Sequence, residues 1–346
     1  MVVEECTPMA LFDGDLGIPD DELAVALLTL PPPLNLADPS EARATFDAAI
    51  APHDELLKKH TSLPEEHEYE VQNRYIPVEA GEIWIRTVVP MSQTMSKPFP
   101  LLIWIHGGAF IVGSPEIDDL MLRKIAVEAK VSVVNVNHRH APEYPYPIPL
   151  NDCYEALKWA VKHSSELSAS PAEGLIIGGC SSGANLAAGL ALRARDDPFF
   201  NKEDGTLLTG QLLQCPALGA VPPQYETGIL SPKLFKDGPL LTAANSAACL
   251  EHYHPDATSP YVSPLLASSL CDIASAYFQV CGMDLLRDSA LLYERLLREN
   301  GVTTKLDIYA GYPHAAHHIL IGLEITNRFQ QDFVNGVRWL IDNPKQ

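Results

Sequence analysis

Residues 179–183 form the pattern Gly-x-Ser-x-Gly around Ser181, and a serine in this pattern can act as a nucleophile. The pattern follows the apolar run Gly174–Gly178 and precedes an alanine-rich segment, which indicates a strand and then a helix. The alternatives are a simple turn with a solvent-facing serine and a phosphate-binding loop. A phosphate-binding loop uses a lysine, and none occurs from Ala169 to Asn201. The pattern therefore favours a nucleophilic serine.

A second glycine-rich turn, His106-Gly107-Gly108-Ala109-Phe110, directly follows the apolar run Leu101–Ile105. Such a turn can point the N–H groups of Gly107 and Gly108 at one spot, together with the N–H group of Ser182. Three converging donors stabilise the negative oxygen that forms when a serine attacks a carbonyl group. Glycine also suits an ordinary tight turn. Finding both turns at strand ends nevertheless favours acyl-transfer chemistry.

A nucleophilic serine needs a base to take its proton and an acid to orient that base. Downstream of Ser181, Asp284 follows one predicted strand and His314 follows the last one. Serine, then aspartate, then histidine is the order found with Gly-x-Ser-x-Gly nucleophiles on open α/β sheets. The sequence therefore predicts a triad of Ser181, Asp284 and His314. The less favoured candidates fall on helices or in an inserted segment, and they are Asp288, His252, His254, His317 and His318.

Short β-type runs alternate with helical segments from residue 76 onward. The predicted strands are Ile83–Val89, Leu101–Ile105, Val131–Val136, Gly174–Gly178, Thr209–Leu213, Ala276–Val280 and Thr304–Tyr309. The predicted helices are Leu120–Ala129, Asp152–His163, Ala184–Arg195, Ser289–Asn300 and Asn327–Leu340. This alternation predicts an α/β fold whose mostly parallel central sheet is covered by helices on both faces. Ligands bind such sheets beyond the carboxyl ends of the strands, where the candidate residues fall.

Residues 1–75 differ from the rest of the chain. They contain two helical segments, Asp20–Leu30 and Ser40–His60, on either side of Pro31–Pro33, and Ser40 is the expected N-cap of the second. We expect this region to form an N-terminal helical cap or to cover one edge of the sheet. Residues 76–346 then form the catalytic domain. A proline-rich insertion at about 221–263 is expected beside the C-terminal edge of the sheet.

The chain of 346 residues has 24 Lys and Arg against 44 Asp and Glu, a formal net charge of −20. Such an acidic surface repels phosphate backbones and anionic lipid, so neither nucleic acid nor a membrane is an expected partner. No basic, apolar signal peptide and no membrane span is visible in the sequence. The seven cysteines have no metal-like spacing. They predict reduced thiols, no bound metal and a cytoplasmic location.

Taken together, the motifs resemble the hormone-sensitive-lipase-like esterases of the α/β-hydrolase superfamily. The resemblance rests on segments in consistent order: His106-Gly-Gly-Ala-Phe, His138-Arg-His-Ala-Pro-Glu143, Asp152-Cys-Tyr-Glu-Ala-Leu-Lys-Trp159, Gly179-Cys-Ser-Ser-Gly, Asp284-Leu-Leu-Arg-Asp and His314. It covers roughly residues 75–340. It implies an α/β-hydrolase fold with a sheet of about eight strands and an N-terminal helical cap.

The same resemblance implies a carboxylesterase that acts on short-to-medium acyl esters of small molecules and uses no cofactor. It gives Arg139 and Glu143 structural roles near the site, and it makes a homodimer possible because the family often pairs sheet edges. Gibberellin receptors share the fold but have lost the histidine. Ser181, Asp284 and His314 are all present in this chain, which disfavours a ligand receptor.

Several positions depart from the family's usual pattern. Ala109 replaces the third glycine of His-Gly-Gly-Gly, Cys180 replaces the usual Asp or Thr, and Ser182 replaces the usual Ala. Ala315-Ala316 follows His314 where Gly-Phe is common, which predicts a roomier pocket. None of these changes removes a catalytic group, so they affect the expected substrate and leave the triad intact.

The motifs leave the scissile bond open, because one fold and one triad serve many substrates. An arylformamidase or amidase and a lactonase are the alternatives to an esterase. Candidate substrate-binding residues are Phe110, Tyr144 and Tyr225. A lipase that binds lipid droplets is disfavoured by the acidic charge and by the lack of a basic amphipathic helix.

Overall fold

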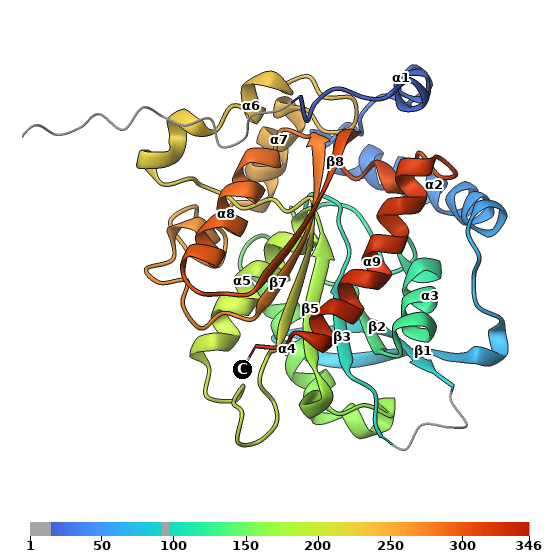
Figure 1. Cartoon of the computed structure of the whole chain (residues 1–346), viewed down its shortest axis with the longest axis vertical. Helices are drawn as coiled ribbons and strands as arrows, with labels where there is room; N and C mark the ends of the chain where they lie inside the picture. The colour runs from blue at the N-terminus through green and yellow to red at the C-terminus, as the bar shows by residue number, and fades with distance from the viewer. Residues whose placement is uncertain (1–14, 92–96, 346) are drawn as a thin grey trace, which may run out of the picture.

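The computed structural model describes residues 15–91 and 97–345, and an eight-stranded sheet forms its centre (Figure 1). The strands are β1 (Tyr69–Val78), β2 (Gly81–Pro90), β3 (Leu101–Ile105), β4 (Ser132–Val136), β5 (Leu175–Cys180), β6 (Gly210–Gln214), β7 (Ser275–Met283) and β8 (Thr304–Pro313). They lie in the order β1-β2-β4-β3-β5-β6-β7-β8. The pairs β1–β2 and β2–β4 are antiparallel, and the other pairs are parallel. The predicted mostly parallel α/β sheet is confirmed.

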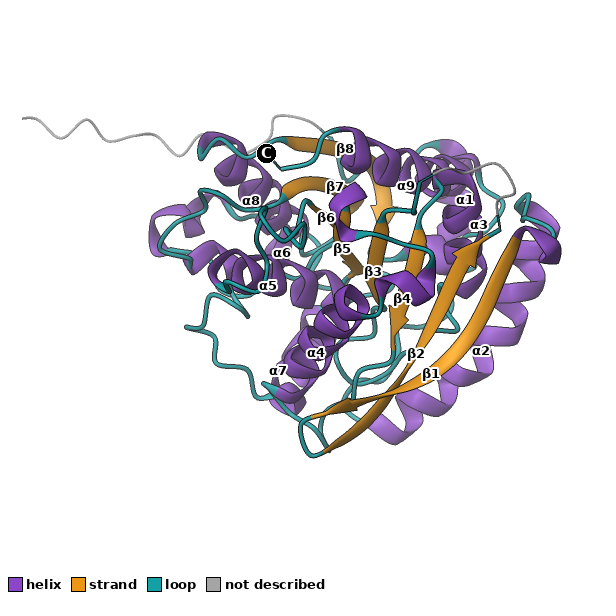
Figure 2. Cartoon of the chain, turned by 90° about the horizontal axis from the view of Figure 1, so that it is seen from below, coloured by secondary structure: helices purple, strands orange, loops and turns teal. Residues whose placement is uncertain are grey.

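Helices lie on both faces of the sheet, with α3 and α9 on one face and α4, α5 and α8 on the other (Figure 2). The α-helices are α1 (Asp21–Leu27), α2 (Pro39–His60), α3 (Asp119–Ala129), α4 (Ile148–Lys162), α5 (Ser182–Asp196), α6 (Ser231–Leu234), α7 (Ala243–Tyr253), α8 (Arg287–Glu299) and α9 (Glu324–Asp342). Short 3₁₀ turns are η1 (Glu66–Glu68), η2 (Ser164–Leu167), η3 (Pro171–Glu173), η4 (Pro223–Gly228), η5 (Pro264–Leu266) and η6 (Ala316–His318).

Strand β3 shows why the sheet needs two helical layers, since all of its side chains are buried. Leu101, Ile103 and Ile105 belong to a core that includes α4, α5 and α8. Leu102 and Trp104 belong to a second core with α3 and α9. Successive side chains of a strand point to opposite faces, so an apolar run of this kind is stable only between two layers.

The edge strand β1 is not among the strands predicted from the sequence. Its residues interleave Glu, Gln, Asn and Arg with apolar side chains, and Ile76 is its one buried residue. β1 pairs on one side only, with β2, and a polar edge discourages pairing with other chains. The same polarity hides the apolar alternation by which a strand is recognised. Because β1 also spans residues 75 and 76, the proposed division into cap and catalytic domain stays a prediction.

In the described part of the chain, two α-helices precede the sheet, as predicted, but the predicted N-cap of the second is wrong. The carboxylate of Asp38 accepts hydrogen bonds from the N–H groups of Ser40 and Glu41 at 3.0 and 3.1 Å. Asp38 therefore caps α2, and Ser40 lies inside the helix. Pro39 fits the first helical position because the N–H that proline lacks would have no partner there.

The segment 221–263 contains η4, α6 and α7 and contributes no strand to the described sheet. Figure 1 shows α6 and α7 at the end of the molecule where β7 and β8 terminate. That is also the end at which ligands bind parallel sheets. A role for this segment as a cap or flap stays a prediction.

Two expectations about the whole chain concern cysteines and membranes. The cysteines in the described part of the chain, Cys153, Cys180, Cys215, Cys249, Cys271 and Cys281, are free thiols, and Cys6 lies outside it. Among the described helices, none is long and apolar enough to cross a membrane. The cytoplasmic location stays a prediction.

Candidate active site

Ser181 lies at the turn between β5 and α5, where its backbone has φ 54° and ψ −114°. A positive φ is unfavourable for a residue with a Cβ, and such strain is typical of a nucleophile at a strand-to-helix turn. The neighbouring glycines permit the turn because a Cβ at Gly183 would lie 2.1 Å from the carbonyl oxygen of Ile105. A Cβ at Gly179 would lie 2.5 Å from the carbonyl carbon of Gly183. The structure has the strand, turn and helix that the sequence predicts.

Asp284 and His314 directly follow β7 and β8, and both side chains reach toward Ser181. His314 Nε2 lies 2.8 Å from Ser181 Oγ, and His314 Nδ1 lies 2.7 Å from Asp284 Oδ2. The other carboxylate oxygen of Asp284 accepts the N–H of Leu286 at 2.9 Å, which fixes its orientation. The structure thus brings together the three residues predicted as a triad.

The proton on His314 belongs on the nitrogen that faces Asp284, since a carboxylate only accepts hydrogen bonds. This tautomer leaves Nε2 free to accept a proton from Ser181. Burial disfavours the charged imidazolium, but the negative charge of Asp284, together with a smaller effect of Cys215, outweighs it and raises the pKa of His314 from 6.5 to about 9. His314 is therefore a stronger base than a free histidine.

The turn after β3 lies against the same serine. A Cβ at Gly107 would lie 3.5 Å from the Cβ of Ser181, so the two backbones are neighbours. Within the described residues, the N–H groups of Gly107, Gly108 and Ser182 donate to no protein acceptor. Three donors without protein partners beside Ser181 are suited to hold a developing oxyanion. Their role as an oxyanion hole stays a prediction.

The turn has an unusual backbone conformation. Gly108, Ala109 and Phe110 all have positive φ, at 127°, 56° and 60°. A Cβ at Gly108 would lie 2.0 Å from the carbonyl oxygen of Val112, so glycine is required there. The carbonyl of Gly108 accepts the N–H groups of Ile111 and Val112 at 3.0 and 2.9 Å. These bonds close the turn. Within the turn, the N–H group of Gly108 has no hydrogen-bond acceptor.

The three residues predicted to bind substrate have different surroundings. Phe110 is 5% exposed, and its ring stacks on Tyr253 of α7 at 3.8 Å between centroids. Tyr144 is 41% exposed and lies 4.9 Å from the Arg139 guanidinium. Tyr225 lies 5.8 Å from Arg295 of α8. Their substrate-binding roles stay predictions, and Tyr253 is an aromatic neighbour of the turn that the sequence did not single out.

Asp288, the less favoured candidate for the acid of the triad, makes structural contacts. Asp288 Oδ2 accepts the N–H groups of Leu230 and Ser231 at the start of α6, and Oδ1 lies 2.8 Å from Arg287 Nε. It acts as a cap and an ion-pair partner. The competing histidines lie elsewhere, with His252 and His254 at the end of α7 and His317 and His318 in η6.

Arg139 and Glu143, given structural roles by the family resemblance, make ion pairs near the site. Arg139 donates from Nε and Nη2 to the buried carboxylate of Asp152, at 2.9 and 2.6 Å. Glu143 accepts two hydrogen bonds from Arg43 of α2, at 2.9 and 2.6 Å. Arg43 has no motif in the sequence, so its position near the turn was not predicted.

Asn185, the last residue of the Gly-x-Ser-x-Gly-Ala-Asn segment, also supports the site. Its Nδ2 donates to the carbonyl groups of Ala217 and Val262, at 2.6 and 2.7 Å. These bonds tie the start of α5 to the segments that follow β6 and α7. In the sequence, Asn185 lies two residues after Gly183, the last residue of the Gly-x-Ser-x-Gly pattern. This position is the signal that could have identified it.

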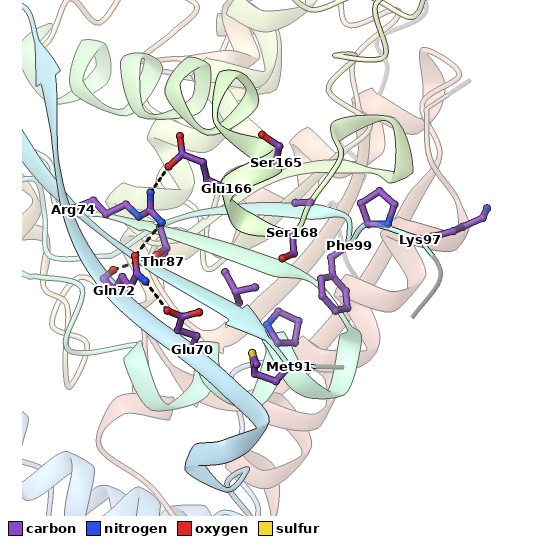
Figure 3. A pocket seen from close by; sticks show the side chains of 14 residues that line it. Glu70, Gln72, Arg74, Thr87, Met91, Lys97, Phe99, Ser165, Glu166 and Ser168 are labelled. Atoms are coloured by element: carbon purple, nitrogen blue, oxygen red, sulfur yellow. Dashed lines mark hydrogen bonds and ion pairs between the residues drawn. The ribbon is translucent and has the colours of Figure 1, made fainter. Parts of the chain in front are cut away.

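A groove of about 650 Å³ lies along β1 and β2, at the edge of the sheet that β1 forms (Figure 3). Arg74 forms an ion pair with Glu166 at 2.6 Å across this groove and donates a hydrogen bond to Gln72 Oε1 at 3.0 Å (Figure 3). Among the described residues that line it, none is a predicted site residue. The groove is therefore not the candidate site.

The fold and the sequence of this chain are similar to those of known proteins. A family described by its alpha/beta hydrolase fold matches residues 102–318. The crystal structure of vibralactone cyclase is 35% identical with a TM-score of 0.91, covering 97% of this chain and 98% of that one. The versiconal hemiacetal acetate esterase of Dothistroma septosporum is 32% identical over 253 residues, covering 72% of this chain and 75% of that protein.

A third relative is much longer than this chain. The FAD-linked oxidoreductase pytB of Aspergillus terreus is 33% identical over 261 residues, which are 75% of this chain but 31% of that protein. The chain therefore spans about a third of that relative. An oxidoreductase activity named for the longer protein does not transfer to the matched part.

The chain belongs to the α/β hydrolase family. The resemblance to hormone-sensitive-lipase-like esterases is confirmed by the family match over residues 102–318. The predicted class of enzyme, a carboxylic ester hydrolase, is confirmed at the level of the family and its esterase relatives.

Proposed function

We propose that the chain cleaves carboxylic esters of small molecules, with short-to-medium acyl chains, and that Ser181 is the nucleophile. The supporting observation is the pair of hydrogen bonds that links Asp284 through His314 to Ser181, at 2.7 and 2.8 Å. A serine-hydrolase triad requires a nucleophile, a base and an orienting acid linked in this way, so the contacts support the proposal. The reaction needs only groups of the chain, the ester and water.

In the first step, His314 Nε2 takes the hydroxyl proton while Ser181 Oγ bonds to the ester carbonyl carbon. The N–H groups of Gly107, Gly108 and Ser182 hold the resulting oxyanion, and Asp284 stabilises the imidazolium. When the tetrahedral intermediate collapses, the C–O bond to the alcohol breaks and His314 gives the alcohol its proton. The acyl group stays on Ser181.

In the second step, water replaces the alcohol. His314 takes one proton from water, the hydroxide oxygen attacks the acyl carbon, and the same donors hold the second oxyanion. Collapse releases the acid, and the proton on His314 returns to Ser181 Oγ. The enzyme is then in its starting state, with no external oxidant or reductant consumed.

The test is hydrolysis of p-nitrophenyl esters from acetate to palmitate by the wild type and by Ser181→Ala. We expect turnover to peak at short acyl chains and kcat to fall by about 10⁴- to 10⁶-fold in the variant. Ser268→Ala, an exposed serine whose side chain makes no described hydrogen bond, is the matched control and should keep wild-type turnover. Near-normal activity of folded Ser181→Ala would refute the assignment. Turnover of p-nitroanilides instead of esters would indicate an amidase.

A second candidate, the opening or closing of a lactone, is supported by the likeness to vibralactone cyclase over 97% of the chain. An acyl-enzyme whose acyl group carries a hydroxyl can be attacked by that hydroxyl instead of by water. The product is then a ring, and the same three residues move the same proton. Ring opening of a series of unsubstituted lactones, by the wild type and by Ser181→Ala, measures this activity. Faster opening of lactones than of matched linear esters would favour the second candidate.

A further inference from the structure

A group of ionisable side chains that the proposed mechanism does not use lies behind the loop that carries His314. Asp118 precedes α3, and His317 and His318 belong to η6. One ligand atom from each of the three residues lies within 4.8 Å of the others. The group therefore brings together one carboxylate and two imidazoles from segments about 200 residues apart, since His318 pairs with Asp118 across that separation.

The contacts of this group leave one imidazole without partners. Asp118 Oδ1 lies 2.9 Å from His318 Nε2, and Asp118 Oδ2 accepts the indole N–H of Trp104 at 2.8 Å. His317 is 8% exposed, and in the described part of the chain neither of its ring nitrogens has a hydrogen-bond partner. Buried polar groups in proteins are nearly always paired, so an imidazole in this position is suited to bind a ligand.

A small cavity lies between these side chains. It is lined by Asp118, His317 and His318, by His53 of α2, and by Gln214 and Gln330, and its volume is about 10 Å³. That is the space of a single water molecule or a single ion. The cavity is too small for an organic ligand, and its lining also includes the apolar side chains of Leu57, Ile117, Met121, Phe329 and Phe333.

We propose that Asp118, His317 and His318 bind one divalent first-row transition-metal ion, with Zn²⁺ as the expected ion. Two imidazoles and one carboxylate form a donor set that binds such ions in preference to Mg²⁺ or Ca²⁺. The indole of Trp104 orients the carboxylate from its second oxygen, as outer partners of metal ligands commonly do.

A second histidine cluster in the structure is less suitable for a metal ion. His106, His138 and His140 also place ligand atoms within 4.8 Å of one another, but this cluster contains no carboxylate. His106 Nδ1 lies 2.8 Å from the carbonyl oxygen of Gly107, and His138 Nδ1 lies 3.0 Å from that of Arg139.

A bound ion would connect three parts of the protein. It would link the residue before α3 to η6, which begins two residues after His314, and it would lie beside His53 of α2. We therefore expect Zn²⁺ to raise the melting temperature of the full chain. The proposal does not depend on the proposed esterase function, because the site shares no ligand with Ser181, Asp284 or His314.

The experiment titrates the full chain, stripped with chelator and dialysed, with Co²⁺ and with Zn²⁺. We expect one ion per chain, a visible Co²⁺ absorption band that Zn²⁺ removes, and a higher melting temperature with Zn²⁺. His317→Ala should weaken binding by at least about tenfold, and Asp118→Asn provides a second variant if His317→Ala does not fold. His67→Ala, an exposed histidine elsewhere, is the matched control and should bind as the wild type does.

Three results would overturn the proposal. The first is a folded wild type that binds no ion at millimolar Co²⁺ or Zn²⁺. The second is binding that folded His317→Ala or Asp118→Asn retains in full. The third is binding that is lost in His140→Ala or Cys215→Ala, because Cys215 can provide a ligand together with Asp284 and His314. All three results are measured as metal binding, so they do not depend on the outcome of the ester assay.

Discussion

Arg43 of helix α2 donates a hydrogen bond of 2.9 Å from its Nε to the main-chain carbonyl of Ile111. Its Nη2 donates to the carbonyl of Ala141 at 2.8 Å, and the N–H of Ala141 in turn donates to the carbonyl of Phe110 at 2.9 Å. One guanidinium thus ties a helix outside the sheet to the turn that contains Gly107 and Gly108. The planar fork of arginine makes this set of bonds, and lysine cannot reproduce it.

Arg43→Lys should lower kcat by about 10- to 100-fold with a small change in KM, since a displacement of about 1 Å in a catalytic group has effects of this size. The measurement is steady-state hydrolysis of the best p-nitrophenyl ester. Glu143→Gln is the control, because it removes the charge opposite Arg43 and leaves both carbonyl bonds possible. If both variants lose activity equally, or Arg43→Lys loses only thermal stability, Arg43 does not position the turn.

The buried ion pair of Arg139 and Asp152 should stabilise the fold rather than the chemistry. The Asp152 carboxylate is fully buried and accepts from Arg139 at N, Nε and Nη2. Arg139→Met leaves this charge without its partner, so we expect the free energy of unfolding to fall by about 3–5 kcal/mol. The double variant Arg139→Met/Asp152→Leu should recover part of that loss. Urea unfolding measures both, and a double variant less stable than Arg139→Met would contradict the argument.

Close packing at Gly183 predicts a large loss of stability on a small substitution. In Gly183→Ala the new Cβ would lie 2.1 Å from the carbonyl oxygen of Ile105 and 2.4 Å from that of His106, both backbone atoms. The strand or the helix must move, and we expect a loss of about 2–4 kcal/mol in the free energy of unfolding.

Gly301→Ala is the matched control for Gly183→Ala. Its φ is 83°, but a Cβ there meets no described atom within 4 Å, so only the backbone strain of about 1–2 kcal/mol remains. Thermal unfolding of both variants tests the comparison. Equal losses in the two variants would show that packing of α5 on β3 is not the cause.

The proximity of Ser181, Asp284 and His314 could be predicted from the sequence because each of them directly follows a strand. Asp284 follows β7 and His314 follows β8, and the carboxyl ends of parallel strands meet at one edge of a sheet. The order of the strands and of these residues along the chain was therefore enough to predict that residues more than a hundred positions apart lie close together. The two glycine-rich turns were recognisable for the same reason.

Other features left no comparable signal. Arg43 binds main-chain carbonyl groups of Ile111 and Ala141, and carbonyl groups are present at every residue, so no side-chain pattern marks the contact. The cluster of Asp118, His317 and His318 forms only when α3 and η6 meet on one side of the sheet. In each case the information lies in tertiary packing, which residue spacing does not encode.

The pH dependence of the reaction should report the pairing of His314 with Asp284. Only a neutral imidazole accepts the proton of Ser181, so kcat/KM should rise with pH as His314 loses its proton. Burial alone would lower the pKa of His314, but Asp284 raises it above 6.5, so the wild-type midpoint should lie above 6.5. The variant Asp284→Asn removes the carboxylate that raises the pKa of His314, but the imidazole stays buried. The midpoint should therefore move to lower pH, while kcat falls by about 10⁴-fold.

The wild-type midpoint comes from the pH profile of kcat/KM, and that of the slow variant from the NMR titration of the His314 ring. Asp288→Asn is the control for the loss of a nearby carboxylate, since Asp288 pairs with Arg287 and the start of α6. It should leave the midpoint in place. A midpoint that stays unchanged in Asp284→Asn would mean that another group sets the basicity of His314, and the assignment of Asp284 as the orienting acid would be wrong.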